Sequence, residues 1–235
     1  MAQNKSHLIN AQDIHPALWR ASQLAGGHSQ TINTGWPDLN QQLPGQGWPC
    51  GALTELCLAQ HGIGELRLLR PALAQCPSQQ QIVLINCPFM PHAQCWANWS
   101  LAGNHPLLWV KTSTLQNTLW AAEQTLRHNA CAALLCWLPA CSPRHLHRLN
   151  VAAQGSEALC FFFSNLQSLR QPSPVPLRIA LKPDPQGLGL HIAKRQGPSC
   201  NRPVVVALND FPRVLMPRIP YVKVASHALD QPVFH

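Results

Sequence analysis

Short apolar runs alternate with helical segments along most of the chain, and this alternation restricts the fold more than any other feature of the sequence. The runs have the length of buried strands and are bounded by turn residues. They cover Ala52–Leu58, Ile82–Asn86, Leu107–Val110, Ala132–Leu138 and Leu159–Phe163. Strands that alternate with helices form β-α-β units, whose right-handed crossovers place helices on both faces of a sheet. The sequence therefore predicts an α/β fold with a mostly parallel sheet flanked by helices.

The expected helices between these strands have recognisable start and stop signals. Ser113 and Gln116 have the spacing of a capping box for a helix that runs to about Asn129. Ser142 begins another helix, which Gly155 ends. A third helix follows the glycine loop after the first strand, and its internal proline should bend it. The residues expected to face the core are Leu66, Leu69, Leu73, Leu115, Leu119, Ala122, Leu126, Leu146, Leu149 and Ala153.

The chain divides into three expected regions. Residues 1–30 contain a short helix that begins near Pro16, followed by a linker rich in Gly, Ser and Gln. Residues 31–208 form the core, which ends in apolar runs around a hairpin-like turn at residues 182–187. These last runs are Leu177–Leu181, Leu190–Lys194 and Val204–Leu208. They predict a C-terminal antiparallel β extension, whereas the prolines of residues 209–235 predict an extended tail.

The glycine loop after the first apolar run stands where many α/β proteins bind a nucleotide phosphate. A working P-loop has the pattern G-x-x-x-x-G-K-[ST], in which the lysine neutralises phosphate and the hydroxyl holds Mg²⁺. This chain has Gly62 and Gly64, but Glu65 stands where the lysine would be, and no Ser or Thr begins the helix. Arg67 follows and is expected to point to solvent. A negative side chain at this place opposes the binding of a triphosphate.

Two further elements of ATP hydrolysis are missing from the sequence. The run that ends at Leu138 supplies no aspartate for Mg²⁺, and the run that ends at Asn86 leads into Cys87-Pro88 without a carboxylate to activate water. No G-x-S-x-G nucleophile elbow occurs either. We therefore expect no catalytic residues, no bound cofactor and no enzymatic activity.

The 10 cysteines and 12 histidines could in principle hold a metal. Cys87, His92 and Cys95 form the best cluster, but they lack the paired ligand spacing of structural zinc sites, so no metal is expected. The sequence shows no signal peptide and no apolar run of membrane-spanning length, which predicts a cytoplasmic protein without membrane contact. The thiols are then expected to be reduced and to act as small apolar residues.

The formal net charge of +8 favours contact with nucleic acid or with an acidic protein, and most of the excess lies after Asn165. The candidate contact residues are Arg144, Arg170, Arg178, Lys194 and Arg195. Because several phosphate contacts are needed for affinity, these few cations favour protein contact over direct binding of DNA.

The tryptophans are expected mainly to pack the interior. Trp109, Trp120 and Trp137 lie in apolar runs and are predicted to be core residues, while Trp36 and Trp48 should pack the turns before the first strand. Trp96 and Trp99 lie in the loop after the second strand, where base stacking is an alternative to loop packing.

The segments around the glycine loop resemble a known family. Thr34–Leu39, Leu43–Gly51 and Thr54–Leu56 are similar to the signature before the P-loop of RecA, with Asn40 where RecA has an aspartate. The blocks LPGQGWPCGALTEL and HGIGELRLLRPALA resemble the ImuA family still more closely, as do LLWV, LWAAEQTLR, PLRIAL and HIAKRQG. The resemblance covers about His15 to Val206, and it implies a RecA-like, P-loop-type core.

Membership of this family would imply a non-catalytic accessory factor in SOS-induced, error-prone translesion DNA synthesis. The implied partners are RecA, an ImuB-type inactive Y-family polymerase subunit and, through it, an error-prone C-family polymerase. The DNA-binding loops of RecA would correspond to Pro139–Arg144 and Leu166–Pro176.

Two alternatives remain open at this stage. SulA, a division inhibitor that binds FtsZ, resembles the middle of this fold, but SulA-type chains do not share the block from Thr34 to Glu55 in this form. A working ATPase is the other alternative, in which Glu65 would be needed for hydrolysis.

Overall fold

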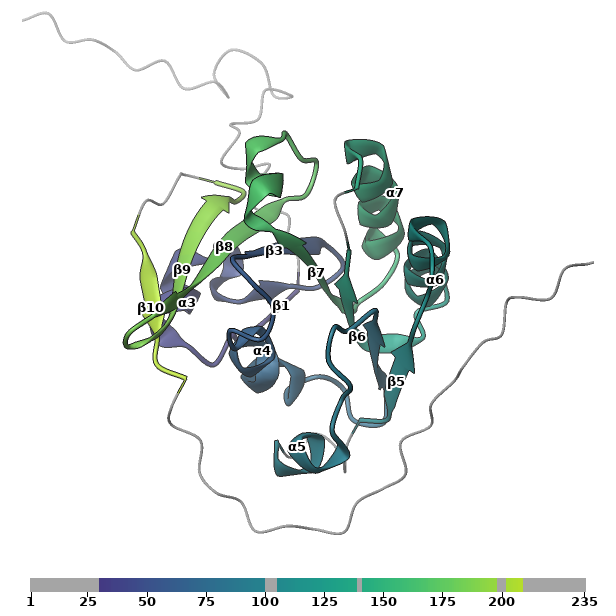
Figure 1. The fold of residues 1–235 in the computed structure, drawn as a ribbon, viewed down its shortest axis with the longest axis horizontal. Helices are drawn as coiled ribbons and strands as arrows, with labels where there is room; N and C mark the ends of the chain where they lie inside the picture. Colours follow the sequence, from purple (N-terminus) through teal and green to yellow (C-terminus); the bar gives the residue numbers. More distant parts are fainter. Residues whose placement is uncertain (1–29, 100–104, 139–140, 198–201, 209–235) are drawn as a thin grey trace, which may run out of the picture.

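An eight-stranded mixed sheet lies at the centre of the protein in this computed structural model, which describes residues 30–99, 105–138, 141–197 and 202–208 (Figure 1). The order across the sheet is β10-β9-β8-β3-β7-β6-β4-β5. The strands are β3 (Leu53–Leu58), β4 (Gln81–Ile85), β5 (Leu107–Val110), β6 (Cys131–Trp137), β7 (Leu159–Asn165), β8 (Leu177–Asp184), β9 (Gly187–Lys194) and β10 (Val204–Val206). All pairs from β8 to β5 are parallel, and β9 and β10 are antiparallel additions. The predicted α/β class and antiparallel extension are therefore confirmed.

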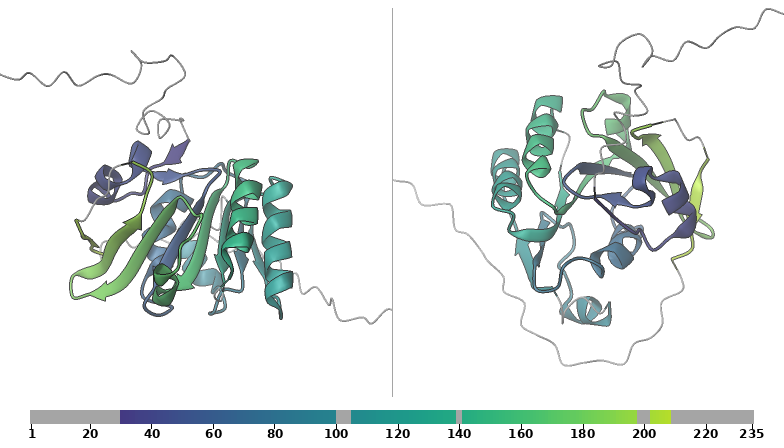
Figure 2. Two further views of the ribbon diagram at one scale, coloured as in Figure 1. Left: turned by 90° about the horizontal axis from the view of Figure 1, so that it is seen from above. Right: turned by 180° about the vertical axis from the view of Figure 1, so that it is seen from behind.

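Helices cover both faces of this sheet (Figure 2). One face carries α6 (Leu115–Arg127) and α7 (Pro143–Gln154), which lie side by side. The other face carries α4 (Glu65–Leu73), together with α3 (Pro37–Gln42), the short η1 (Pro44–Gln46) and α5 (Ala93–Asn98). A small antiparallel sheet of β1 (Thr31–Ile32) and β2 (Trp48–Pro49) precedes β3.

Each face of the sheet has its own hydrophobic cluster, because successive strand residues point to opposite sides. In β4, Ile82 and Leu84 belong to the cluster under α4, while Val83 and Ile85 belong to the cluster under α6 and α7. Burial on both faces explains why the parallel strands read as continuous apolar runs rather than as an alternating pattern.

The β8–β9 hairpin closes through a tight turn at Pro185 and Gln186. Gly187 has a φ of +144°, and a β-carbon there would stand 2.1 Å from the carbonyl oxygen of Val206. Glycine is therefore required at this position, because β10 passes directly beside it.

The start of α6 differs from the prediction. The capping residue is Thr114, whose hydroxyl accepts a hydrogen bond from the Asn117 amide at 3.1 Å, so the predicted capping box of Ser113 and Gln116 is wrong. Trp120 was expected in the core, and this prediction is also wrong, since 52% of the residue is exposed.

A half-buried side-chain amide explains how α6 is turned. The Asn86 side chain, at the end of β4, donates to the hydroxyls of Thr112 and Thr118 at 2.8 and 3.0 Å and accepts from the Thr112 amide at 2.8 Å. These bonds draw Thr118 inward, and it is buried together with Ala122 and Leu126. The predicted inward residues Leu115 and Leu119 are only partly buried.

The other predicted helices are confirmed in place. The Ser142 hydroxyl caps α7 by accepting from the His145 amide, and Gly155 follows its last turn. In α4 the buried apolar residues are Leu68, Leu69, Ala72 and Leu73, whereas Leu66 is only partly buried. The predicted N-terminal helix near Pro16 and the tail of residues 209–235 lie outside the described residues. Within the described ranges, no helix has the length and apolar character needed to cross a membrane.

Candidate functional site

The glycine loop between β3 and α4 folds around its own acidic side chain. Glu65 is the first residue of α4, and only 4% of it is exposed. Its carboxylate accepts hydrogen bonds from the Gly62 amide at 2.9 Å and from the Gly64 amide at 3.1 Å. Both glycines have positive φ angles, +80° and +111°, which turn their amides toward the carboxylate.

This geometry places a carboxylate where such loops usually hold a phosphate. Backbone amides at a loop and at a helix N-terminus attract an anion, and the helix dipole adds to the attraction. Here the anion is supplied by Glu65 itself. An incoming phosphate would have to displace this side chain and would then lie beside its negative charge.

Two apolar side chains pack against the same loop. A β-carbon on Gly64 would stand 2.3 Å from Leu208 Cδ1, and one on Gly62 would stand 3.1 Å from Phe89 Cε2. Leu208 follows β10 and is buried, while Phe89 lies in the loop after β4. The loop is thus occupied from within and partly covered from outside, while Arg67 is exposed as predicted.

The end of the strand β6 is apolar. Trp137 is the last residue of β6 and stacks on Phe163 of β7, with ring centroids 4.3 Å apart and 18° between the planes. An aromatic stack therefore takes the place where a metal-binding aspartate would be needed for phosphate chemistry.

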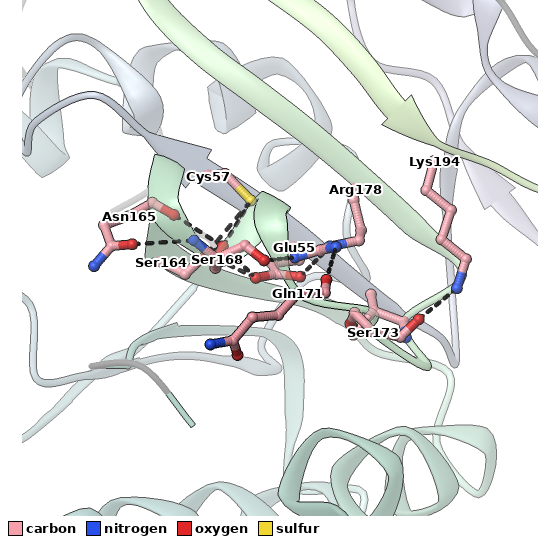
Figure 3. Close-up of polar contacts among 10 residues, drawn as sticks. Glu55, Cys57, Ser164, Asn165, Ser168, Gln171, Ser173, Arg178 and Lys194 are labelled. Atoms are coloured by element: carbon pink, nitrogen blue, oxygen red, sulfur yellow. Dashed lines mark hydrogen bonds and ion pairs between the residues drawn. The ribbon is translucent and has the colours of Figure 1, made fainter. Parts of the chain in front are cut away.

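A second polar cluster lies inside the sheet, between β3, β7 and β8 (Figure 3). Glu55 and Arg178 pair directly across neighbouring strands, and both are buried. Arg178 Nε donates to Glu55 Oε2 at 2.6 Å. The hydroxyls of Ser164 and Ser168 donate to Glu55 Oε1 at 2.8 and 3.0 Å. Both carboxylate oxygens are thus engaged.

The same arginine holds the loop that follows β7. Arg178 Nη2 donates to the carbonyl oxygen of Ser168 at 2.7 Å, and Nη1 donates to that of Gln171 at 3.0 Å. Ser168 belongs to the short helix η2 (Leu166–Arg170), whose first turn is capped by Asn165. The segment that the RecA resemblance would assign to a DNA-binding loop is therefore anchored to the buried ion pair.

Cys57 is the one thiol in this cluster, and its surroundings do not activate it. Its sulfur lies 3.3 Å from Ser168 Oγ and 3.5 Å from Ser164 Oγ. Burial raises the pKa of the Cys57 thiol, so it stays protonated at neutral pH. Of the described residues that line the adjoining cavity, none is a histidine that could act as its base.

The cavity beside the cluster is small. It has a volume of about 110 Å³ and lies between the loop after β7 and the start of α7, with Leu138, Cys141, Leu146, Gln167 and Pro172 in its wall. Pockets for cofactors or drug-sized ligands are typically ~300–1,000 Å³. The cavity therefore cannot take a nucleotide.

The five predicted contact residues have different environments. Arg144 and Arg170 are exposed, and Lys194 is exposed while its Nζ donates to the Ser173 carbonyl oxygen at 2.6 Å. Arg195 is half-buried and donates to the carbonyl oxygen of Gln42. Arg178 is the exception, because its guanidinium is buried against Glu55 and is not a surface cation.

Three of these cations are connected to the small cavity by sequence or by a hydrogen bond. Pro143, Gln171 and Ser173 line the small cavity. Pro143 precedes Arg144 in the chain, Gln171 follows Arg170, and the carbonyl oxygen of Ser173 accepts a hydrogen bond from Lys194. Arg144 and Arg170 are thus each next in sequence to a residue of the cavity lining, and Lys194 is hydrogen-bonded to one.

Sequence reasoning missed the roles of Glu55 and of the two serines. Glu55 lies inside the run ALTELCL, which reads as a buried strand. A lone acid within such a run is itself a signal, because a buried charge needs a partner. The partner, Arg178, lies 123 residues further along the chain, and its pairing cannot be read from local spacing.

Cys87, His92 and Cys95, the cluster that the sequence offered and from which no metal site was expected, differ in their exposure. Cys87 is buried and Cys95 is exposed, and within the described parts of the chain no group of three His, Cys, Asp or Glu residues could hold a metal ion.

Several tryptophan predictions can also be compared with the structure. Trp48 is buried edge-on against Phe161, as expected, and Trp36 donates to the Leu68 carbonyl oxygen at 2.9 Å. The predicted loop placement of Trp96 and Trp99 is wrong, because Trp96 lies in α5 and Trp99 caps its end. Trp96 is buried near Trp99, with ring centroids 6.3 Å apart, which favours packing over base stacking.

Comparison with known proteins adds no assignment. No family model matches the sequence, and no curated protein matches it at a significant level. Its function is therefore inferred from its own residues and their geometry.

The first prediction concerns the carboxylate in the glycine loop. Glu65→Gln replaces a charged acceptor of two amide bonds by one neutral carbonyl oxygen, so we expect a loss of about 1–2 kcal/mol in the free energy of unfolding. Hydrogen exchange should accelerate at the Gly62 and Gly64 amides. Arg67→Gln, a matched change at an exposed residue of the same helix, should leave both quantities unchanged. Unaltered protection of these amides in Glu65→Gln would contradict the geometry.

The second prediction concerns the buried ion pair. Arg178→Met leaves Glu55 buried without its cation, and we expect the free energy of unfolding to fall by about 3–5 kcal/mol. The double variant Glu55→Leu/Arg178→Met removes both charges and should regain most of this loss in chemical denaturation. A double variant no more stable than Arg178→Met would show that the pair is not the anchor.

Proposed function

We propose that this protein is a non-catalytic, RecA-like accessory factor of the ImuA type, which serves SOS-induced, error-prone translesion DNA synthesis by docking other proteins. The observation that carries the proposal is the Glu65 carboxylate on the amides of Gly62 and Gly64. A nucleotide-binding fold whose phosphate loop is occupied by its own carboxylate keeps the arrangement of strands and helices but loses the ability to hydrolyse ATP.

The arrangement of the sheet supports a RecA-like origin. The strand that leads into the glycine loop, β3, is separated from β6 by one strand, β7. By the resemblance, β3 would be the P-loop strand and β6 the strand whose end would carry a metal-binding aspartate. The ending of β7, which resembles the entry to the second DNA-binding loop of RecA, leads here into η2.

The block that most resembles the ImuA family has a structural task in this chain. Leu43–Gly51 forms η1, β2 and the turn before β3, and Trp48 within it is fully buried. Asn40, which stands where RecA has an aspartate, accepts a hydrogen bond from the Thr34 amide at 3.0 Å. The resembling segments thus build the entrance to the sheet rather than a catalytic surface.

The partners that fit this proposal are proteins. RecA and the ImuB-type polymerase subunit would bind directly, and the error-prone C-family polymerase would be reached through that subunit. Direct DNA contact is expected to be weak, because burial of Arg178 leaves few exposed cations near the loop after β7.

A nucleotide test addresses the silent phosphate loop. Isothermal titration of the full chain with Mg-ATP should give no binding, and turnover should stay at background under conditions in which RecA hydrolyses ATP. Glu65→Ala frees two amides and should gain weak phosphate binding without turnover, because no lysine or Mg²⁺ ligand is restored. Wild-type hydrolysis that Glu65→Ala abolishes would overturn the proposal.

A binding test addresses the accessory role. The tagged full chain should capture purified RecA and the ImuB-type subunit, whereas an unrelated α/β protein used as bait should capture neither. FtsZ should not be captured, and its GTPase rate should be unchanged. Capture of FtsZ together with a lowered GTPase rate would replace the proposal by that of a SulA-type division inhibitor.

A further inference from the structure

The outer surface of α6 and α7 carries an open hollow that the glycine loop and the ion-pair cluster do not touch. It has a volume of about 740 Å³ and is lined by residues of both helices, among them Leu115, Leu119, Trp120, His145 and Arg148. The two helices lie side by side at the edge of the molecule in both views (Figures 1 and 2). The hollow can take several apolar side chains of another molecule.

An exposed tryptophan and a histidine meet at this hollow. Trp120 is 52% exposed, a large apolar surface of the kind that anchors protein interfaces. His145 Nδ1 is buried and has no hydrogen-bond partner within the described part of the chain.

The accessible charge of the two helices is positive. Glu123 is their one carboxylate, and it is buried between Arg127, at 2.7 Å, and Arg148. The hydrogen bond from Arg148, together with both positive charges, lowers the pKa of Glu123, so it remains ionised. The charged groups of α6 and α7 that are exposed to solvent are therefore the outer parts of Arg127 and Arg148, together with Arg144.

The segments that the chain itself could supply as occupants carry no excess of acidic groups. The segment of residues 209–235 carries Arg213, Arg218 and Lys223 against two aspartates, and residues 1–29 are also net basic. A second copy would bring an equally positive face. None of these therefore brings an acidic surface that would complement the arginines.

A nucleic acid fits the hollow less well than a protein does. The two helices offer only Arg127, Arg144 and Arg148, whereas affinity for DNA requires several phosphate contacts. The floor formed by Leu115, Leu119 and Trp120 is apolar and instead suits the side chains of an amphipathic helix.

We propose that the α6–α7 face docks an acidic amphipathic helix of a partner protein. Its apolar side chains enter the hollow over Leu115, Leu119 and Trp120, and its carboxylates face Arg144 and Arg148. The inference deepens the proposed accessory function and rests on it for the presence of a protein partner.

The test uses a fluorescently labelled helical peptide with leucines on one face and glutamates on the other. Anisotropy should show saturable binding to the full chain, weakened by salt. Trp120→Ala should raise Kd about tenfold or more, and Arg144→Glu about fivefold, since interface aromatics and rim charges contribute on this scale. The matched control is Phe89→Ala, an equally exposed aromatic in the loop after β4, which should leave Kd unchanged.

Several outcomes would overturn the inference. These are no binding of the acidic peptide, equal binding of its lysine counterpart, an unchanged Kd in Trp120→Ala, or stronger binding of single-stranded oligonucleotide that displaces the peptide. The two proposals fail separately. If Trp120→Ala still captures RecA or the ImuB-type subunit as the wild type does, only the docking role of the α6–α7 face is contradicted. If the peptide binds in a Trp120-dependent way but the wild type captures neither protein, only the accessory function is contradicted.

Discussion

The pairing of Glu55 with Arg178 is the contact on which the arrangement of the sheet's middle depends. It joins β3 to β8, and through the carbonyl oxygens of Ser168 and Gln171 it also fixes the loop that leaves β7. A charge inside a parallel sheet would be costly alone, but here the two serines and the guanidinium satisfy both carboxylate oxygens. The pair therefore links two neighbouring strands and the loop after β7 through one buried guanidinium.

Inward-turned acids recur in this protein and are neutralised in three different ways. Glu55 meets an arginine inside the sheet, Glu65 meets backbone amides, and Glu123 meets two arginines beneath the helix surface. The sequence is poor in charge, so these three placements remove much of the negative charge from the accessible surface. The positive character expected from composition is in this way concentrated on particular faces.

The architecture was predictable from sequence because it depends on run length and turn residues, which are local properties. All the expected strands of the core and the β8–β9 hairpin were found, with ends shifted by one or a few residues. The orientation of α6 was not predictable, because Asn86 selects Thr118 for burial and leaves Trp120 outside. The sequence showed that Glu65 replaces a lysine, but only the positive φ angles of the two glycines reveal that its carboxylate turns back onto the loop. Long-range partners such as Arg178 carry no local signal.

The position of β3 between β7 and β8 has a consequence for the newborn chain. This strand is the first of the large sheet to leave the ribosome, yet both its neighbours come from the last part of the core, with Ser164 and Arg178 lying 109 and 123 residues beyond Glu55. Until they are synthesised, β3 has two open edges and an uncompensated acid in an apolar segment, a state prone to aggregation. The strand therefore stays unpaired on both edges until nearly the whole core has been synthesised.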